Sequence, residues 1–289
     1  MTRIMIAGMG GQLGFELGRV LGDSGHEVVA PTEGVLDITD AGAVKAYIAR
    51  TKPDVIINCA AYTAVDKAES DREKAFAVNR DGPENLAVAA SEAGARLIHI
   101  STDFVFDGSV CRALKPDDRP TPLSVYGSSK LAGEQRVLAA LPDSLVIRTA
   151  WLYSSFGNNF VKTMLRLMNE RDNLGVVVDQ IGTPTWAGSL AEVIVKAVSS
   201  EARGLLHWSD AGVASWYDFA AAIYEEGRRL GLVRKETAIR PITTAEYPLP
   251  AVRPAFSVLD KSLTYSTLAV APVHWRTNLI RCLEEIKGQ

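Results

Sequence analysis

The first 22 residues combine a short apolar run, a cluster of glycines and an apolar pattern with helical spacing. Residues 3–7 are apolar enough for a buried strand, the glycines of residues 8–14 follow at once, and Leu13, Leu17 and Leu21 then recur on one helical face. A strand that turns through glycines into a helix leaves backbone N–H groups at the helix start, where a pyrophosphate can bind. The beginning of the chain therefore predicts a dinucleotide-binding unit of an α/β fold.

The glycines follow the spacing G-x-x-G-x-x-G, which differs from the G-x-G-x-x-G of many dehydrogenases. Gly8 and Gly11 allow a tight turn and a close phosphate, Gly14 lets the helix pack near the strand, and Gly10 adds flexibility. An ordinary strand–helix connection is the alternative interpretation. The strand and helix patterns on either side favour the dinucleotide site.

Strand and helix patterns alternate through the first half of the chain. Further strands are expected at 27–30, 54–58, 97–101 and 145–148, and helices at 41–50, at 71–93 with an interruption near Gly82 and Pro83, and at 126–141. This alternation predicts an α/β fold with a Rossmann-like doubly wound parallel sheet and a smaller C-terminal substrate-binding lobe. We expect a dinucleotide-binding domain at 1–150, to which segments near 175–208 return, and a sugar-nucleotide substrate lobe at 151–289.

Polar or glycine-rich segments follow four of the expected strands. They are Gly8, Asn58–Ala61, Ser101–Asp103 and Thr149–Trp151. Ligands of parallel sheets gather at the carboxyl ends of the strands, so these four segments are expected to meet on one rim.

Tyr126 and Lys130 lie four residues apart on an expected helix, and the hydroxyl of Thr102 precedes them. Positions i and i+4 share a helix face, so the Lys130 ammonium can lie close to the Tyr126 phenol. A nearby positive charge favours the phenolate and lowers the phenol pKa, which suits a general acid. A tyrosine and lysine at a solvated helix start is the commoner explanation of such a pair, and the glycine turn and Thr102 argue against it.

Composition excludes several classes of protein. The net charge of −3 over 289 residues gives no reason to expect nucleic acid or a membrane surface as a partner. No apolar stretch reaches the ~18 residues of a spanning helix, and no signal segment opens the chain. Cys59, Cys111 and Cys282 offer neither a disulfide framework nor a zinc pattern. We therefore expect a cytoplasmic protein with free thiols.

Taken together, the motifs resemble those of the extended short-chain dehydrogenase/reductases, and within them the dTDP-4-dehydrorhamnose reductase family, over essentially the whole chain. The run Thr63–Glu69 and the segment around Trp151 are more specific to this family than the glycine turn. The segments that carry the resemblance are Gly8–Gly14 with Glu16, Cys59–Glu69, Ser101–Gly108, Tyr126–Glu134, Arg148–Tyr153, Asn158–Val161, Asp179–Gln180, Gly182–Thr185 and Arg253–Pro254.

The resemblance implies reduction of the C4 keto group of a dTDP-4-keto-6-deoxy sugar (dTDP-4-dehydrorhamnose to dTDP-L-rhamnose), by hydride transfer from a reduced nicotinamide, in surface polysaccharide biosynthesis. The cofactor is NADP(H) or NAD(H): the region after the second strand has Glu33 but offers no arginine for a 2′-phosphate. The implied partner is a dTDP-sugar, and the chain is expected to be a monomer or a homodimer.

The resemblance also assigns roles to residues. Tyr126 protonates the carbonyl oxygen, Lys130 holds the nicotinamide ribose and lowers the tyrosine pKa, and Thr102 orients the reacting oxygen. The implied cofactor-binding residues are Gly8, Gly10, Gly11, Gln12, Leu13, Gly14, Asp37, Ile38, Ala60, Ala61, Thr63, Tyr126 and Lys130. The implied substrate-binding residues are Thr63, Val65, Thr102, Asp103, Phe104, Tyr126, Trp151 and Arg253. The family often has tyrosine at position 104, so Phe104 lacks a hydroxyl that could bind the sugar.

Other interpretations stay open for some of these residues. Thr102 could cap a turn, and Trp151 could be a core residue. Asp66 and Glu69 are expected on a solvated helix face. Asn79 could cap a helix or fix the loop behind the catalytic tyrosine.

Three other functions share the expected fold. Another sugar-nucleotide reductase or an epimerase would use the same framework. A 4,6-dehydratase of this superfamily needs a second acid after the threonine, where this chain has Phe104. A non-catalytic, cofactor-binding regulatory homologue would not need the intact set of Thr102, Tyr126 and Lys130.

Some relatives bind magnesium between subunits. Glu16 matches one ligand position, but Gly188 stands where another carboxylate would align. Hard cations need several oxygen ligands, so we expect no metal. Because Glu16 lies off the apolar stripe of Leu13 and Leu17, we expect it on the exposed side of the first helix.

Overall fold

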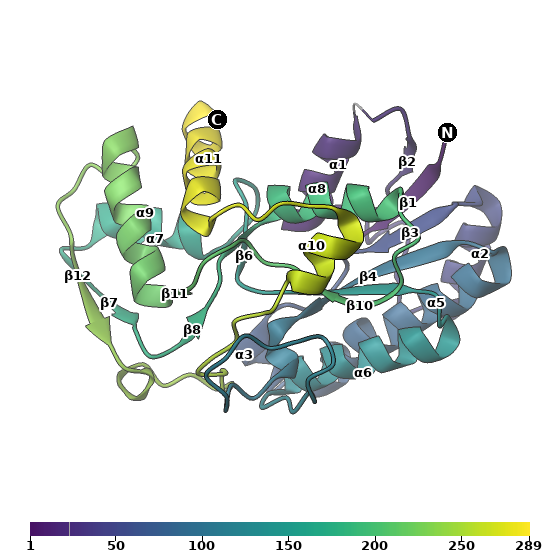
Figure 1. Ribbon diagram of the computed structural model, residues 1–289, viewed down its shortest axis with the longest axis horizontal. Helices are drawn as coiled ribbons and strands as arrows, with labels where there is room; N and C mark the ends of the chain where they lie inside the picture. The colour runs from purple at the N-terminus through teal and green to yellow at the C-terminus, as the bar shows by residue number, and fades with distance from the viewer. Residues whose placement is uncertain (23) are drawn as a thin grey trace.

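The computed structural model describes residues 1–22 and 24–289, and a six-stranded parallel sheet forms its centre (Figure 1). The strand order is β10 (Gly204–His207), β5 (Leu145–Thr149), β4 (Arg96–Thr102), β3 (Val55–Asn58), β1 (Arg3–Ala7) and β2 (Glu27–Val29). Every neighbouring pair in this order is parallel. The predicted parallel α/β fold is thereby confirmed.

Helices cover both faces of the sheet, and strand β1 shows why. Ile4 and Ile6 point to the face covered by α1 (Gln12–Gly22) and α8 (Ala187–Val198), whereas Met5 and Ala7 point to the opposite face. That face is covered by α2 (Ala41–Thr51), α5 (Gly82–Ala93) and α6 (Val125–Ala140). Side chains alternate along a strand, so a strand that is apolar at every position must be buried on both sides.

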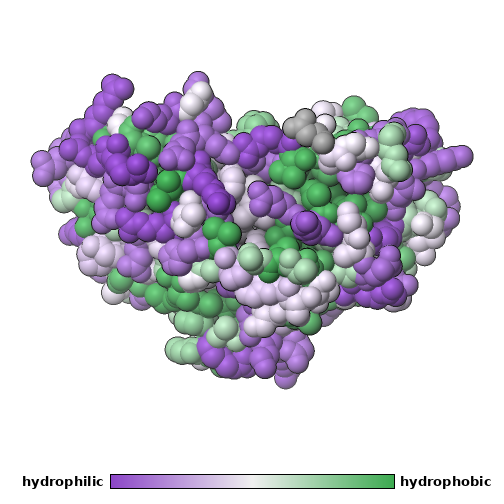
Figure 2. Space-filling model, turned by 45° about the horizontal axis from the view of Figure 1, so that its top comes forward, coloured by the Kyte–Doolittle hydropathy of each residue, from purple (hydrophilic) through white to green (hydrophobic). Residues whose placement is uncertain are grey.

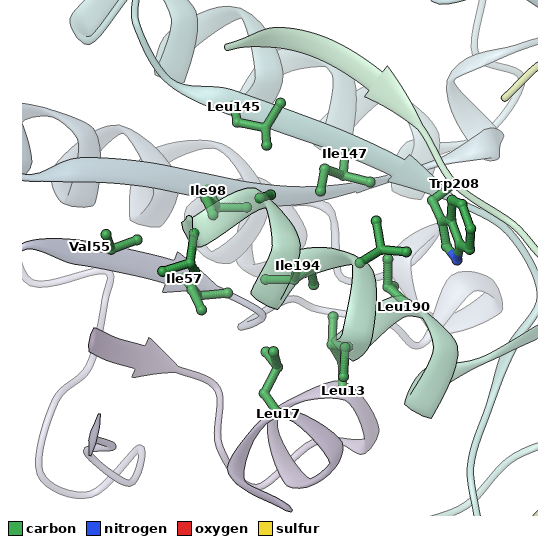
Figure 3. Packing of buried hydrophobic residues seen from close by; sticks show 14 of the residues in the cluster. Leu13, Leu17, Val55, Ile57, Ile98, Leu145, Ile147, Leu190, Ile194 and Trp208 are labelled. Atoms are coloured by element: carbon green, nitrogen blue, oxygen red, sulfur yellow. The ribbon is translucent and has the colours of Figure 1, made fainter. Parts of the chain in front are cut away.

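Figure 3 shows the packing on the α1 and α8 face. Leu13 and Leu17 of α1 and Leu190 and Ile194 of α8 meet the apolar side chains of the central strands, among them Ile57. All five side chains are at most 4% exposed. Strand β10 and helix α8 therefore join the first half of the chain through the sheet and its core.

The chain reverses direction across the sheet at β1, because β2 pairs with one side of β1 and β3 with the other. Such a reversal opens a crevice beyond the carboxyl ends of the two strands. The glycine turn follows β1 at this point, and Cys59 to Ala61 follow β3 beside it. The topology thus supplies a place for a dinucleotide.

The segment between β3 and α5 contains three short helices. They are α3 (Val65–Ala68), α4 (Arg72–Phe76) and the π-helix η1 (Ala77–Asp81). The expected helical interruption near Gly82 corresponds to this π-helix. A Cβ at Gly82 would lie 2.6 Å from the Cδ1 of Ile38, so a side chain there would push apart α5 and the loop after β2.

A second region is built around its own apolar core, shown at the left of Figure 1. Its centre is formed by Phe219, Ile223, Leu279 and Leu283, all fully buried. The elements are β6 (Leu152–Tyr153), α7 (Phe160–Glu170), β7 (Asn173–Val177), β8 (Ile181–Gly182), β9 (Thr185–Trp186), β11 (Ala214–Ser215), α9 (Trp216–Leu230), β12 (Ala238–Ile242) and α11 (Trp275–Gly288). Strand β7 pairs with β12 in this region, and the return to the main sheet begins at α8.

Three short helices complete the described chain. They are the 3₁₀ helices η2 (Asp103–Val105) and η3 (Thr244–Glu246), and α10 (Ser262–Leu268). The face drawn in Figure 2 mixes hydrophilic residues with several separate hydrophobic groups. None of the helices formed by residues 1–22 and 24–289 combines the length and the apolar character needed to cross a bilayer.

Candidate active site

The glycine turn has one side held by backbone contacts and one side open. Gly8 has a φ of +87°, and a Cβ there would lie 2.5 Å from the backbone nitrogen of Ala60. A Cβ at Gly14 would lie 2.3 Å from the carbonyl oxygen of Gly8. These two glycines therefore bring α1, β1 and the end of β3 together, as expected for Gly14.

Gly10 and Gly11 are exposed and form the open side of the turn. A Cβ at Gly10 would meet nothing within 4 Å, and one at Gly11 only the carbonyl oxygen of Gly8 at 3.5 Å. The N–H groups at the start of α1 have no intrahelical acceptors and can bind an anion. The turn thus fits the pyrophosphate of a dinucleotide.

The other expected cofactor residues differ in exposure. Gln12 is half-buried, whereas Leu13 belongs to the apolar core. Asp37 is exposed and accepts hydrogen bonds from the N–H and hydroxyl of Thr39, which lower its pKa. Ile38 is buried beneath that loop. Ala60 and Ala61 are half-buried at the end of β3, and Thr63 is exposed.

Thr102, Asp103 and Tyr126 form a buried group at the end of β4. The hydroxyl of Thr102 donates to Oδ1 of Asp103 at 3.1 Å, and Thr102 lies near enough to the Tyr126 phenol to lower its pKa. Burial raises the pKa of Tyr126 to about 12, Thr102 lowers it, and the charge of Asp103 raises it. Burial raises the pKa of Asp103 to about 6. The phenol is therefore protonated at neutral pH, as a proton donor must be.

Lys130 shares the buried face of α6 with Tyr126, but its ammonium is held elsewhere. Its Nζ donates to the carbonyl oxygen of Ile100 at 2.7 Å. Burial lowers the pKa of Lys130 to about 8. The expectation that Lys130 lowers the pKa of Tyr126 is therefore wrong for this structure, since burial dominates and the pKa of the phenol is raised.

Asn79 fixes the loop behind the catalytic helix, which decides between its two interpretations. Its Oδ1 accepts from the N–H of Tyr62 at 2.8 Å, and its Nδ2 donates to the Tyr62 carbonyl and to the Ser129 hydroxyl, both at 3.0 Å. Ser129 donates in turn to the carbonyl oxygen of Tyr126 at 2.8 Å. The loop after β3 and the first turn of α6 are thus joined by one buried amide.

A pocket lies beside Tyr126, between the main sheet and the second region. Four of the expected substrate residues line it: Asp103, Phe104, Trp151 and Arg253. The ring of Phe104 meets that of Tyr126 edge to face at 5.5 Å. The enclosed part of the pocket has a volume of about 20 Å³, which suffices for one or two waters. A sugar ring must therefore move some of these side chains.

Trp151 combines the two roles considered for it. It has a φ of +46°, and its ring stacks on that of Trp216 with centroids 3.6 Å apart and an angle of 6° between the planes. One face of the indole is therefore covered, while Trp151 still lines the pocket. A non-glycine residue with positive φ is uncommon and is held here by this packing.

Four expected substrate residues do not line the enclosed pocket: Thr63, Val65, Thr102 and Tyr126. Val65 packs in the cluster of Tyr126 and Phe104 without reaching the pocket wall. Thr63 is exposed at the end of the β3 loop. Four residues that sequence analysis did not place in the site do line it: Gln180, Trp216, Pro254 and Ser257. Gln180 and Pro254 stand in segments that carry the family resemblance, but Trp216 and Ser257 stand in none.

Arg253 closes the rim of the pocket through an ion pair. Its guanidinium donates two hydrogen bonds to the carboxylate of Asp66, at 3.0 and 2.7 Å, and Asp66 also accepts from the N–H of Ala251. These contacts lower the pKa of Asp66. Glu69 accepts the N–H of Val125 at the start of α6. The expectation that Asp66 and Glu69 only form a solvated face is therefore wrong, because each joins two segments.

Glu16 is buried, and the expectation of an exposed side chain is wrong. Its Oε1 accepts from the hydroxyl of Ser154 at 2.6 Å, and its Oε2 pairs with Arg19 at 2.9 Å. Burial raises its pKa. The second region covers the side of α1 that the apolar stripe leaves free. Among the described residues, no three histidine, cysteine, aspartate or glutamate side chains are grouped to hold a metal. The absence of a metal stays a prediction.

The doubly wound sheet, the open glycine turn at its reversal and the buried tyrosine and lysine on the same rim define the class of short-chain dehydrogenase/reductases. The family model described as RmlD substrate binding domain matches residues 1–287. The chain therefore belongs to that family.

Relatives of known name match over nearly their full length. The dTDP-4-dehydrorhamnose reductase of Aggregatibacter actinomycetemcomitans is 43% identical over 295 residues, which are 100% of this chain and 99% of that protein. The spore coat polysaccharide biosynthesis protein SpsK of Bacillus subtilis is 41% identical over 285 residues, 99% of this chain and 98% of that protein.

A solved structure is similar throughout. The crystal structure of dTDP-4-dehydrorhamnose reductase from Bacillus anthracis in complex with NADP has a TM-score of 0.94 at 36% identity. The match covers 98% of this chain and 99% of that one.

Proposed function

We propose that this protein reduces the C4 keto group of a dTDP-4-keto-6-deoxy sugar, converting dTDP-4-dehydrorhamnose to dTDP-L-rhamnose for polysaccharide biosynthesis. The observation that carries the proposal is the position of Tyr126. Its protonated phenol lies at the end of β4, beside Thr102, on the same rim as the open glycine turn. Relatives that are about 40% identical over their whole length bear the name of this activity.

NADP(H) or NAD(H) would supply the hydride when bound, with its pyrophosphate at Gly10 and Gly11. The residues of the chain orient the carbonyl group and supply its proton. Tyr126 donates the proton to the carbonyl oxygen, and Thr102, which contacts the phenol, orients that oxygen. Lys130, whose ammonium donates to the Ile100 carbonyl in this structure, would hold the ribose hydroxyls. In this assignment Tyr126 supplies the proton to the carbonyl oxygen, and the cofactor would supply the hydride to the carbonyl carbon.

We propose that the sugar occupies the pocket of Asp103, Phe104 and Trp151. Arg253 stands at its rim and would meet the negatively charged diphosphate. Since the enclosed pocket is small, substrate entry has to displace side chains that line it. The ion pair with Asp66 orients Arg253 before the substrate arrives.

The proposed division of the chain follows the two apolar cores. Residues 1–150, with the return from α8 to β10, form the dinucleotide-binding domain, and the remainder of 151–289 forms the substrate lobe. The main sheet core unites β1, β5 and β10 with α1 and α8, while the second core contains α7, α9 and α11. The pocket lies where the two meet.

The proposed function is tested by supplying purified protein with NADPH or NADH and a 4-keto sugar nucleotide. We expect oxidation of the cofactor only when dTDP-4-dehydrorhamnose is present. An epimerase would interconvert sugars without net cofactor oxidation, and a non-catalytic regulatory protein would bind cofactor without turnover. Either result would replace the proposal with the corresponding alternative.

A further inference from the structure

The loop between β6 and α7 lies against the start of the helix that follows the glycine turn. The hydroxyl of Ser154 donates to the buried carboxylate of Glu16, a partner 138 residues away in the chain. The ring of Phe156 stacks on that of Phe15, with centroids 4.3 Å apart and 7° between the planes. The cofactor helix is thus held from its outer side by the second region.

Asn159 lies at the centre of this contact, and both the oxygen and the nitrogen of its side-chain amide form hydrogen bonds. Its Oδ1 accepts from the N–H of Lys162 at 3.1 Å and caps α7. Its Nδ2 donates to the carbonyl oxygen of Ser154 at 2.7 Å and to Oε1 of Gln12 at 3.0 Å. A primary amide nitrogen carries two hydrogens, so both are engaged.

These partners determine which way the Asn159 amide points. A backbone carbonyl can only accept and a backbone N–H can only donate, so Nδ2 must face Ser154 and Oδ1 must face Lys162. The hydrogen that remains on Nδ2 requires an acceptor. The atom of Gln12 that faces Asn159 must therefore be Oε1, and the Nε2 of Gln12 must face the other way.

Gln12 is the first residue of α1 and directly follows the exposed Gly10 and Gly11. With Oε1 engaged, its Nε2 carries two donors. Within residues 1–22 and 24–289, no acceptor forms a hydrogen bond with this nitrogen. Unengaged donors next to the open N–H groups of a helix start suit an anion.

We propose that Asn159 is a positioning residue for the cofactor: it fixes the amide of Gln12 so that Nε2 donates to a pyrophosphate oxygen. This inference rests on the proposed function only in that the glycine turn binds a dinucleotide. It gives the second region a direct role in cofactor binding, because Asn159 belongs to that region and Gln12 to the turn.

The substitution Asn159→Asp tests the proposal with almost no change of shape. Aspartate keeps the oxygen that caps α7, and it is among the preferred capping residues. It cannot donate to Oε1, so Gln12 reverses its amide to donate to the new carboxylate and turns Oε1 towards the phosphate. We expect NADPH affinity, measured by calorimetry, to fall about 10- to 100-fold, the range expected for a lost hydrogen bond to a charged group.

Two controls separate amide orientation from the added charge. Asn158→Asp places the same charge on the exposed neighbouring residue and should leave NADPH affinity within about 3-fold of wild type. Gln12→Met removes the donor itself and should weaken binding as Asn159→Asp does. In the Gln12→Met background, Asn159→Asp should then have little further effect, because the two residues act through one contact.

The inference is overturned if Asn159→Asp weakens binding equally with and without Gln12, or if it leaves affinity unchanged in a folded protein. Should the Asn159→Asp variant fail to fold, Gln12→Glu decides the matter. Its two oxygens accept from Asn159 and face the phosphate, so it should show the same loss, and unchanged affinity would refute the proposal. A wild-type protein that binds no nicotinamide cofactor would refute the proposed function instead.

Discussion

The glycine turn and the sugar pocket are built in different ways, although they lie on one rim. The turn consists of consecutive residues, and its shape follows from backbone contacts such as that of Gly8 with Ala60. The pocket gathers side chains from segments far apart in the chain, for example Phe104, Trp216 and Arg253. The first kind of site can be predicted from local sequence, and the second depends on how distant segments pack.

The largest effect is expected where the two sites meet. Tyr126→Phe keeps the ring that contacts Phe104 but removes the proton donor. We expect turnover to fall about 10²- to 10⁴-fold, the usual contribution of general acid catalysis, with cofactor affinity nearly unchanged. Steady-state rates and calorimetric titration with NADPH measure the two quantities. Turnover close to that of wild type would remove Tyr126 from the mechanism.

A side chain on the open part of the turn should impair the cofactor site alone. In Gly11→Val the first added atom meets only the Gly8 carbonyl, at 3.5 Å, so the protein should fold. The side chain occupies the approach of the pyrophosphate, and we expect NADPH affinity to fall about 10- to 100-fold, as for lost hydrogen bonds to a charged group. Gly22→Ala, also in open space, is the control. Unchanged affinity in a folded Gly11→Val protein would move the cofactor site elsewhere.

The pH dependence of activity should report the protonation state of Lys130. Burial lowers its pKa to about 8, so the ammonium is present below that pH and is lost as the pH rises through it. We expect kcat/KM to decline above pH 8, by about tenfold per unit once the neutral amine predominates, if the charged form is required. Lys130→Met should abolish this limb of the profile along with most of the activity. A wild-type profile that is flat between pH 7 and about 10 would contradict the role of the ammonium.

Breaking the ion pair at the rim of the pocket should affect the binding of the sugar nucleotide and leave cofactor binding unchanged. Asp66→Asn removes the charge that orients Arg253, and partly exposed pairs contribute only about 0.2–1 kcal/mol. We expect the KM for the sugar nucleotide to rise about 2- to 5-fold with NADPH affinity unchanged. Asp172→Asn, which breaks the surface pair with Lys235, serves as the control. A lower KM would mean that Asp66 competes with the substrate for Arg253.

Chelation should have the smallest effect. In the proposed mechanism Tyr126 and Thr102 polarise the carbonyl, so hydride transfer would need no Lewis acid. The candidate ligand Glu16 is engaged by Ser154 and Arg19. We expect activity to survive prolonged treatment with EDTA. Activity that disappears on chelation and returns with magnesium alone would show that the site depends on a metal.

Local patterns predicted much of the fold because they have local causes. Residues 41–50 were expected as a helix and form most of α2, which Asp40 caps by accepting from the N–H of Ala43. The alternation of strand and helix patterns predicted a parallel sheet that is covered on both faces. The π-helix at 77–81 was predicted only as an interruption of a helix, because a change to i→i+5 hydrogen bonds is not visible in the pattern of residues.

Residues whose contacts come from distant parts of the chain were predicted less well. Glu16 looked exposed because the apolar stripe of α1 lies elsewhere, and nothing near it in the sequence points to Ser154. The pKa of Tyr126 was expected to follow a neighbour on the same helix, but the surrounding burial outweighs it. Trp216 was not expected in the site, since its stacking on Trp151 joins two segments that are far apart in the chain.

Tyr126 is expected to supply the proton in a cofactor-dependent reduction carried out by this chain. The most direct measurement is the oxidation of NADPH by wild type and by Tyr126→Phe, with dTDP-4-dehydrorhamnose supplied and the product identified by NMR. Wild type should form one dTDP-L-rhamnose for each NADPH oxidised, and the variant should form almost no dTDP-L-rhamnose. Equal rates in the two proteins, or a changed sugar without cofactor oxidation, would contradict it.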